Sequence, residues 1–203
     1  MYIPQSLIYL GFARTYVITI PAQGHDLIHS SSSPVRVLEY RVKYGEEMHN
    51  IAEKTTLHHQ HETSSEHLDM HKIPETIKRG GIGTTLRGLV NFTSAAESHK
   101  GLCHGGAMCS VFDDIIGWTA FCVTGVCIPW SGYTVEVNTR LMKPVPLGSL
   151  LELSCTVTKV ERRKVYLHAT LMKHRALHMN EDHGFLYASA DGLVILNKEH
   201  ARM

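Results

Sequence analysis

Residues 104–123 read HGGAMCSVFDDIIGWTAFCV, and this stretch decides the fold. Its apolar side chains recur at spacings of four and three, which is typical of a helix with one buried stripe. The stripe consists of Ala107, Val111, Ile115, Trp118 and Cys122. Because Met108, Phe112 and Ile116 widen this stripe, we expect a long helix over roughly 106–123 that other elements wrap around.

The segments on either side of this helix show the alternation of strands. Five strands are predicted, at 84–93, 131–142, 150–160, 164–172 and 186–196. The links between the last four are short, at 143–148, 161–163 and 178–184, which predicts that they join antiparallel neighbours. The order of elements therefore predicts an α+β fold in which an antiparallel sheet curls around one central helix.

Composition limits the partners of this chain of 203 residues. Lys and Arg number 20 and Asp and Glu 19, so a net charge of +1 argues against nucleic acid or an anionic membrane as a partner. No stretch approaches the roughly 18 apolar residues of a membrane span. The five cysteines form no CxxC pair, and we interpret them as buried side chains in a reducing compartment, the cytoplasm or alternatively the mitochondrion.

The chain changes character near residue 75. Residues 1–75 are predicted to be an N-terminal extension, partly helical or loop, with a short helix at 44–57 and a polar linker or solvated helix at 58–71. The HHQH run at 58–61 lies in this linker, and since no cysteine or close acidic set completes a site, we interpret it as composition and predict no metal. Residues 76–203 are predicted to form the folded domain.

The start of the helix is the first candidate site. Gly105 and Gly106 allow close approach to amides that have no acceptor within the helix, where a carbonyl oxygen gaining negative charge is stabilised, or they merely permit tight packing. Asp113 and Asp114 are carboxylates within an apolar helix and are candidates for a base or nucleophile. Asp113 lies about 12 Å along the axis from Gly105, so a shared site would need the aspartate of a second subunit, which predicts an isologous dimer.

These motifs together carry a family resemblance. HGGAMCSVFDD, followed by YTVEVNTRLMKPVPLG and KVERRKVYLHATL, resembles the hotdog-fold acyl-CoA thioesterases of the PaaI-type and thioesterase superfamily member branch, from about Leu86 to Leu196. The resemblance implies a hotdog fold, with an antiparallel sheet of five to six strands around one long helix. It implies hydrolysis of acyl-CoA with no further cofactor, by a homodimer, with pairing into a tetramer left open.

The resemblance also implies roles for individual residues. Asp113 matches the family's catalytic carboxylate, as general base or as nucleophile, and the amide of Gly105 or Gly106 would polarise the thioester carbonyl. His104 would position that carbonyl, and Thr134 matches a residue that orients the attacking water in some members. The basic residues Lys143, Arg163 and Lys164 would hold the phosphates of coenzyme A, or form an ordinary solvated turn.

The resemblance leaves the substrate and two other functions open. Ser98 stands where some members carry Asn or Gln, which affects substrate preference more than reaction type. We expect the acyl chain to run between helix and sheet along Met108, Phe112 and Trp118. The alternative functions are a non-catalytic hotdog module that binds acyl-CoA or a protein, and a hotdog dehydratase or hydratase.

Overall fold

The computed structural model describes residues 7–8, 15–18, 28, 33–45, 80–125, 127–174 and 185–199. The helix expected at 44–57 lies outside these residues except for Tyr44 and Gly45, which form no regular element. The expected linker at 58–71, with its HHQH run, also lies outside them.

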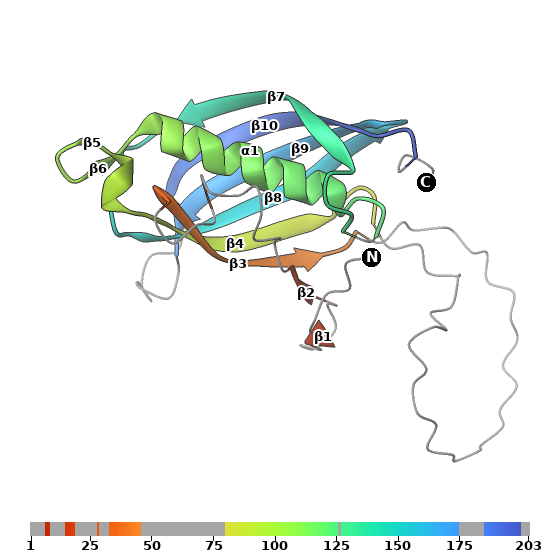
Figure 1. The fold of residues 1–203 in the computed structure, drawn as a ribbon, viewed down its shortest axis with the longest axis horizontal. Helices are drawn as coiled ribbons and strands as arrows, with labels where there is room; N and C mark the ends of the chain where they lie inside the picture. The colour runs from red at the N-terminus through yellow and green to blue at the C-terminus, as the bar shows by residue number, and fades with distance from the viewer. Residues whose placement is uncertain are drawn as a thin grey trace, which may run out of the picture.

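One helix lies in the concave face of one antiparallel sheet, as predicted (Figure 1). The helix α1 runs over Gly105–Phe121. The main strands are β3 (Val35–Lys43), β4 (Thr85–Phe92), β7 (Gly132–Leu141), β8 (Leu150–Glu161), β9 (Lys164–Lys173) and β10 (Leu186–Leu196). Their order across the sheet is β3-β4-β8-β9-β10-β7, and the short strands β1 (Leu7–Ile8) and β2 (Thr15–Ile18) extend the sheet beyond β3. The hotdog architecture expected from the resemblance is therefore confirmed.

Strand β3 was not predicted, because a bulge hides its alternation. Val35, Tyr40 and Val42 are buried, but the register against β4 shifts between Val37 and Glu39, so Leu38 is an extra residue and is 59% exposed. A bulge moves the inward-facing residues from odd to even positions, which defeats a period-two pattern. Because β3 pairs with β4 along its length, part of the region 1–75 belongs to the main sheet.

The link at 143–148 does not join neighbouring strands, which corrects the prediction. Strand β7 pairs with β10 at the edge of the sheet, whereas β8 lies between β4 and β9. Pro144 and Pro146 have no N–H, which disfavours a tight hairpin. The link instead crosses the end of the molecule, where the N–H of Cys103 donates to the carbonyl of Val145 (2.9 Å) between β6 (Leu102–Cys103) and the buried Val145.

Several apolar side chains of β7 are exposed. Tyr133 is 56% and Val135 50% exposed, while Thr134 and Val137 are half-buried. The register with β10 shifts at Val135, which again interrupts the alternation. Since β7 is an edge strand, its apolar residues have no partner strand on one side among the described residues.

The helix divides into a buried half and an outward-facing half. Every residue from Ile115 to Val123 is buried, whereas the preceding turns expose Gly106, Cys109 and Asp113. These three lie within about 60° of one another around the helix axis. The fold therefore presents one polar strip of α1 to the surface, at its N-terminal half.

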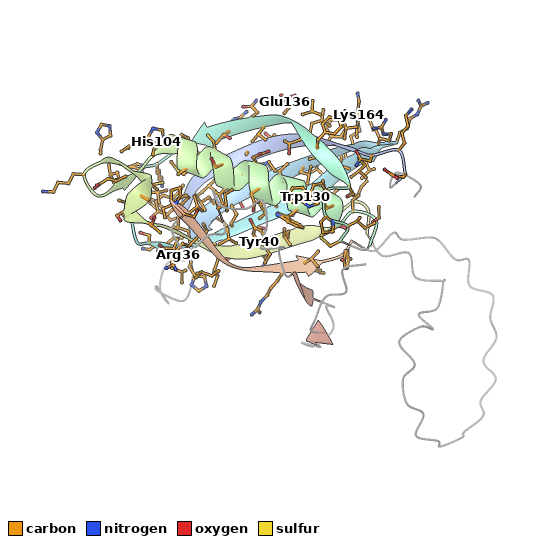
Figure 2. All side chains as sticks on the ribbon, in the orientation of Figure 1. Arg36, Tyr40, His104, Trp130, Glu136 and Lys164 are labelled. Carbon is orange, nitrogen blue, oxygen red and sulfur yellow. The ribbon has the colours of Figure 1, made fainter. Side chains whose placement is uncertain are left out.

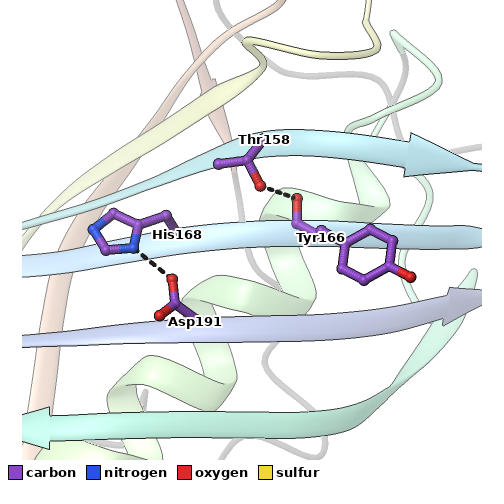
Figure 3. A network of polar contacts seen from close by, with 4 residues as sticks. All are labelled: Thr158, Tyr166, His168 and Asp191. Carbon is purple, nitrogen blue, oxygen red and sulfur yellow. Dashed lines mark hydrogen bonds and ion pairs between the residues drawn. The ribbon is translucent and has the colours of Figure 1, made fainter.

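The convex face of the sheet is polar. His168 and Asp191, from β9 and β10, lie 2.7 Å apart, and the Thr158 hydroxyl donates to the carbonyl of Tyr166 (3.1 Å; Figure 3). All of these pairs are on or close to the surface, far from the outward strip of the helix. Among the described residues, no helix has the length and apolarity needed to cross a bilayer.

Candidate functional site

His104 caps the start of α1 through its side chain. Its Nδ1 accepts a hydrogen bond from the N–H of Gly106 at 2.9 Å, and its backbone N–H donates to the carbonyl of Ala96 at 2.7 Å. The ring is exposed at one end of the molecule (Figure 2). The imidazole therefore acts as the N-cap and has its second nitrogen toward solvent.

The backbone N–H of Gly105 is available to donate a hydrogen bond to a ligand. The sequence pointed to Gly105 or Gly106, but the N–H of Gly106 is taken by His104, whereas that of Gly105 has no hydrogen-bond acceptor among the described residues. A Cβ on Gly105 would lie 2.8 Å from Cδ1 of Leu141, at the end of β7. This glycine thus lets β7 and the helix start come together beside an open donor, where the helix dipole adds partial positive charge.

The two neighbouring aspartates have different surroundings. Asp113 is exposed, and no described residue forms a hydrogen bond or ion pair with its carboxylate. Asp114 is half-buried and accepts a hydrogen bond from the hydroxyl of Tyr40 at 2.7 Å. Periodicity left both candidates open, and the structure shows that Asp114 connects α1 to β3 while Asp113 is available on the outward strip.

Tyr40 was missed by sequence reasoning. It is 1% exposed, and its direct partner on β4 is Gly88, which has no side chain to compete with the ring. Burial, and then the negative charge of Asp114, raise the pKa of Tyr40 well above 10.0. The phenol therefore remains a neutral donor to Asp114 at physiological pH.

Thr134 lies close to the outward strip of the helix. A Cβ on Gly117 would be 3.9 Å from Oγ1 of Thr134. Gly117 is one turn beyond Asp113 on the same side of α1, about 6 Å along the axis. The threonine hydroxyl is thus placed near Asp113.

The three basic residues do not form one cluster within a protomer. Lys143 follows β7, where its Nζ lies 3.5 Å from the centroid of the Phe185 ring and its N–H donates to Tyr187. Arg163 lies at the opposite end of the sheet, with its Nε donating to the carbonyl of Leu196 at 2.7 Å, and the exposed Lys164 begins β9 beside it (Figure 2). The two groups are about 25 Å apart along β9.

The space between helix and sheet is filled. Met108, Phe112 and Trp118 are 4%, 0% and 2% exposed and belong to one core cluster. These side chains have almost no exposed surface, so no channel for an acyl chain is open beside them among the described residues. The structure therefore gives no support to the expected acyl path, which stays a prediction.

A cavity opens instead beside the start of α1. Its volume is about 310 Å³, and Gly106, Ala107 and Ser110 of the helix form one side. The other side comes from Pro34 and Val35, before and within β3, and from the segment 95–97. Sequence reasoning did not find this cavity, because its walls come from segments about 60 residues apart.

Cys103 lies next to His104 but is not an activated thiol. Burial raises its pKa to about 11, so at neutral pH it is protonated. Its Sγ contacts the carbonyl of His104 at 3.4 Å. The interpretation of the cysteines as buried side chains is thus confirmed for Cys103, Cys122 and Cys155, but it is wrong for Cys109, which is exposed on α1, and Cys127 is half-buried.

Two sequence comparisons both find similarity to thioesterases. The sequence pattern of the thioesterase superfamily matches residues 100–175. Acyl-coenzyme A thioesterase THEM4 of Bos taurus is 32% identical over 95 residues, which are 47% of this chain and 34% of that protein. The matched region therefore spans about a third of the length of this curated relative.

Solved structures with a similar chain fold include two thioesterases. One is a hypothetical thioesterase with coenzyme A from Streptococcus pneumoniae, with 14% identity, coverage of 58% of this chain and 81% of that chain, and a TM-score of 0.47. The other is zebra fish thioesterase superfamily member 2, with 19% identity, coverage of 58% and 78%, and a TM-score of 0.47.

Proposed function

We propose that this chain, whose residues 100–175 match the sequence pattern of the thioesterase superfamily, is a member of that superfamily and hydrolyses acyl-CoA to a free acid and coenzyme A. The proposal is carried by one observation, which is that two adjacent carboxylates of α1 have different surroundings. Asp114 is engaged by Tyr40, whereas Asp113 is exposed on the same strip of α1 as the open end of the helix. An available carboxylate and a free amide are the two groups that thioester hydrolysis requires.

The amide of Gly105 polarises the thioester carbonyl. It donates to the carbonyl oxygen, which becomes negative as the tetrahedral intermediate forms, and the helix dipole favours that charge. His104 fixes the geometry by holding the amide of Gly106, so that only Gly105 is presented to the substrate.

Asp113 supplies the attacking group in one of two ways. As a base, it takes a proton from water while the water oxygen bonds to the carbonyl carbon, and the carbon–sulfur bond then breaks as the thiolate of coenzyme A leaves and takes up that proton. As a nucleophile, its carboxylate oxygen bonds to the carbonyl carbon while the carbon–sulfur bond breaks and the thiolate of coenzyme A leaves, which gives an acyl-aspartyl anhydride. Water then attacks the aspartyl carbon of the anhydride, the acid is released, and the proton left on Asp113 goes to the thiolate. Single turnover in ¹⁸O-water separates this route from the base route, because the first acid released then carries only unlabelled oxygen, whereas the base route places one ¹⁸O in it.

The active site is formed by two subunits. Asp113 lies about 12 Å along the helix from Gly105, too far to serve a carbonyl bound at its own helix start. In an isologous dimer with antiparallel helices, Asp113 of the partner subunit faces Gly105. The exposed apolar residues of the edge strand β7, Tyr133 and Val135, supply a surface for this contact.

The same dimer explains how the basic residues act together. Antiparallel pairing at the β7 edges places Lys143 near the start of the partner's β7, and that end of each subunit carries Arg163 and Lys164. We therefore propose that the phosphates of coenzyme A bind between Lys143 and the partner's basic pair.

The five cysteines are free thiols, which supports a reducing compartment such as the cytoplasm.

Asp113→Asn tests the catalytic assignment, and Asp114→Asn is its matched control. We expect Asp113→Asn to lower kcat about 100-fold or more in a thiol-release assay on a panel of acyl-CoAs. Asp114→Asn keeps an oxygen that accepts from Tyr40 and should retain most of the activity. Equal activity of Asp113→Asn and wild type would refute the role of Asp113, and acyl-CoA binding without thiol release would favour a non-catalytic module.

Cross-linking through Cys109 tests the proposed dimer. If Gly105 faces Asp113 of the partner subunit, the two-fold axis passes the midpoint of 105 and 113, so Cys109 faces Cys109 of the partner subunit. Cys109 is exposed on the outward strip, and a short bismaleimide should cross-link two wild-type chains but not Cys109→Ser. A monomer in sedimentation velocity, or cross-linking that persists in Cys109→Ser, would contradict this arrangement.

A further inference from the structure

We infer that the cavity beside the start of α1 binds the acyl group of the substrate, an inference that rests on the proposed function. The interior between helix and sheet is filled, so an acyl group at the thioester site needs another place. The cavity of about 310 Å³ begins at His104 and Gly106, immediately beside the open amide of Gly105. A group attached to a carbonyl held at Gly105 would therefore meet this cavity on the β3 side of the helix start.

The lining of the cavity suits an apolar ligand. Five of its residues are apolar and mostly small: Pro34, Val35, Ala95, Ala96 and Ala107. The polar groups are already engaged, since the Ser110 hydroxyl donates to the carbonyl of Gly106 at 2.9 Å and Glu97 accepts from the N–H of Gly101 at 2.6 Å. Ligand pockets in proteins are mainly apolar with few polar groups left to satisfy. An alkyl group therefore meets mainly apolar surface in this cavity.

Charge fixes which end of the substrate enters. The Glu97 carboxylate lines the cavity and disfavours the phosphates of coenzyme A. The cation Lys143 lies on the other side of the helix start, after β7, whose Leu141 approaches Gly105. The substrate therefore crosses the start of α1, with its acyl group on the β3 side and coenzyme A on the β7 side.

The walls of the cavity set its selectivity. A volume of about 310 Å³ is at the lower end of the roughly 300–1,000 Å³ typical of ligand pockets. The cavity thus favours short or medium linear acyl groups over long chains. One side of the cavity, formed by Pro34 and Val35 and by the segment 95–97, lies outside the region 100–175 that matches the superfamily, so residues outside that region help to set this preference.

Filling the cavity tests the inference. Ala95→Leu and Ala107→Leu each project a larger side chain from the lining, and Ser94→Leu is the control, because Ser94 is the exposed neighbour of Ala95 and does not line the cavity. We expect kcat/KM for hexanoyl-CoA to fall at least about tenfold in the first two variants, with acetyl-CoA changed less than about twofold. Ser94→Leu should keep the wild-type profile.

A binding measurement separates this inference from the proposed function. Titration calorimetry with the unreactive hexyl and methyl thioethers of coenzyme A should show that Ala95→Leu and Ala107→Leu weaken only the hexyl compound. If wild type releases no thiol from any acyl-CoA, the proposed function fails, while the thioether titration still decides the cavity. An unchanged chain-length profile, an equal loss for both acyl groups, or the same shift in Ser94→Leu would overturn the inference.

Discussion

Removal of the Tyr40 hydroxyl measures how firmly β3 is attached to the central helix. In Tyr40→Phe the ring still fills the space opposite Gly88, but the 2.7 Å hydrogen bond to Asp114 is lost. A hydrogen bond to a charged group contributes about 1.5–3 kcal/mol, and because Tyr40 is 1% exposed while Asp114 is half-buried, solvent replaces the lost hydroxyl only in part. We expect an unfolding free energy lower by about 1.5–3 kcal/mol, and a Tm lower by about 3–10 °C.

The assay is urea unfolding followed by circular dichroism, with calorimetry for the Tm. Tyr166→Phe is the matched control, because its hydroxyl also donates to a carboxylate, that of Glu161 at 3.0 Å, but on the surface. That variant should show no measurable change, as is typical of surface substitutions. Equal stability of Tyr40→Phe and wild type, or equal losses in both variants, would refute the argument that β3 is tied to α1 through this buried pair.

The same bond predicts a pH dependence of stability. The pKa of Tyr40 is raised above 10.0 in the folded protein by burial and by Asp114, so the folded state favours the protonated phenol. This contribution is complete below about pH 10 and is lost as the pH rises further, because the unfolded chain then releases the proton that the folded chain retains. The stability advantage of wild type over Tyr40→Phe should therefore shrink above pH 10, and an advantage that grows with alkaline pH would contradict the sign.

Two further predictions follow from packing and burial. Gly192→Ala places a Cβ 2.7 Å from Cγ2 of Ile116, so it should destabilise the protein by about 1–3 kcal/mol in urea unfolding, and combining it with Ile116→Ala should cost less than the sum of the two single variants. In native thiol labelling at pH 8, Cys109 should react first because it is exposed, while Cys103 and Cys155, whose pKa values burial raises to about 11 and about 12, should remain unmodified until the protein unfolds. Mass spectrometry that finds Cys155 labelled before Cys109 would show that this burial is wrong.

Regular alternation explains why two of the central strands were predicted. Strands β8 and β9 bury every second residue along most of their length, so a period of two identified both of them. Strand β3 was missed because the bulge at Leu38 shifts its buried residues by one position. Strand β7 was predicted, but several of its apolar residues are exposed. An alternating pattern shows which residues share a side of a strand, but it does not show whether that side packs inside the same chain or faces outward.

The sequence by itself determined the long apolar helix, the antiparallel strands around it and the pair of motifs that carry the family resemblance, because these depend on local periodicity and spacing. It also yielded the 12 Å separation of Gly105 and Asp113, which follows from helix geometry alone. The resemblance favoured Asp113 but left Gly105 and Gly106 open. Only the tertiary structure shows which of these groups already has a hydrogen-bond partner, because Tyr40 and the His104 ring are placed by packing. The catalytic roles stay predictions. The cavity beside the helix start likewise forms only where segments distant in sequence come together, and a local sequence pattern cannot predict such a contact.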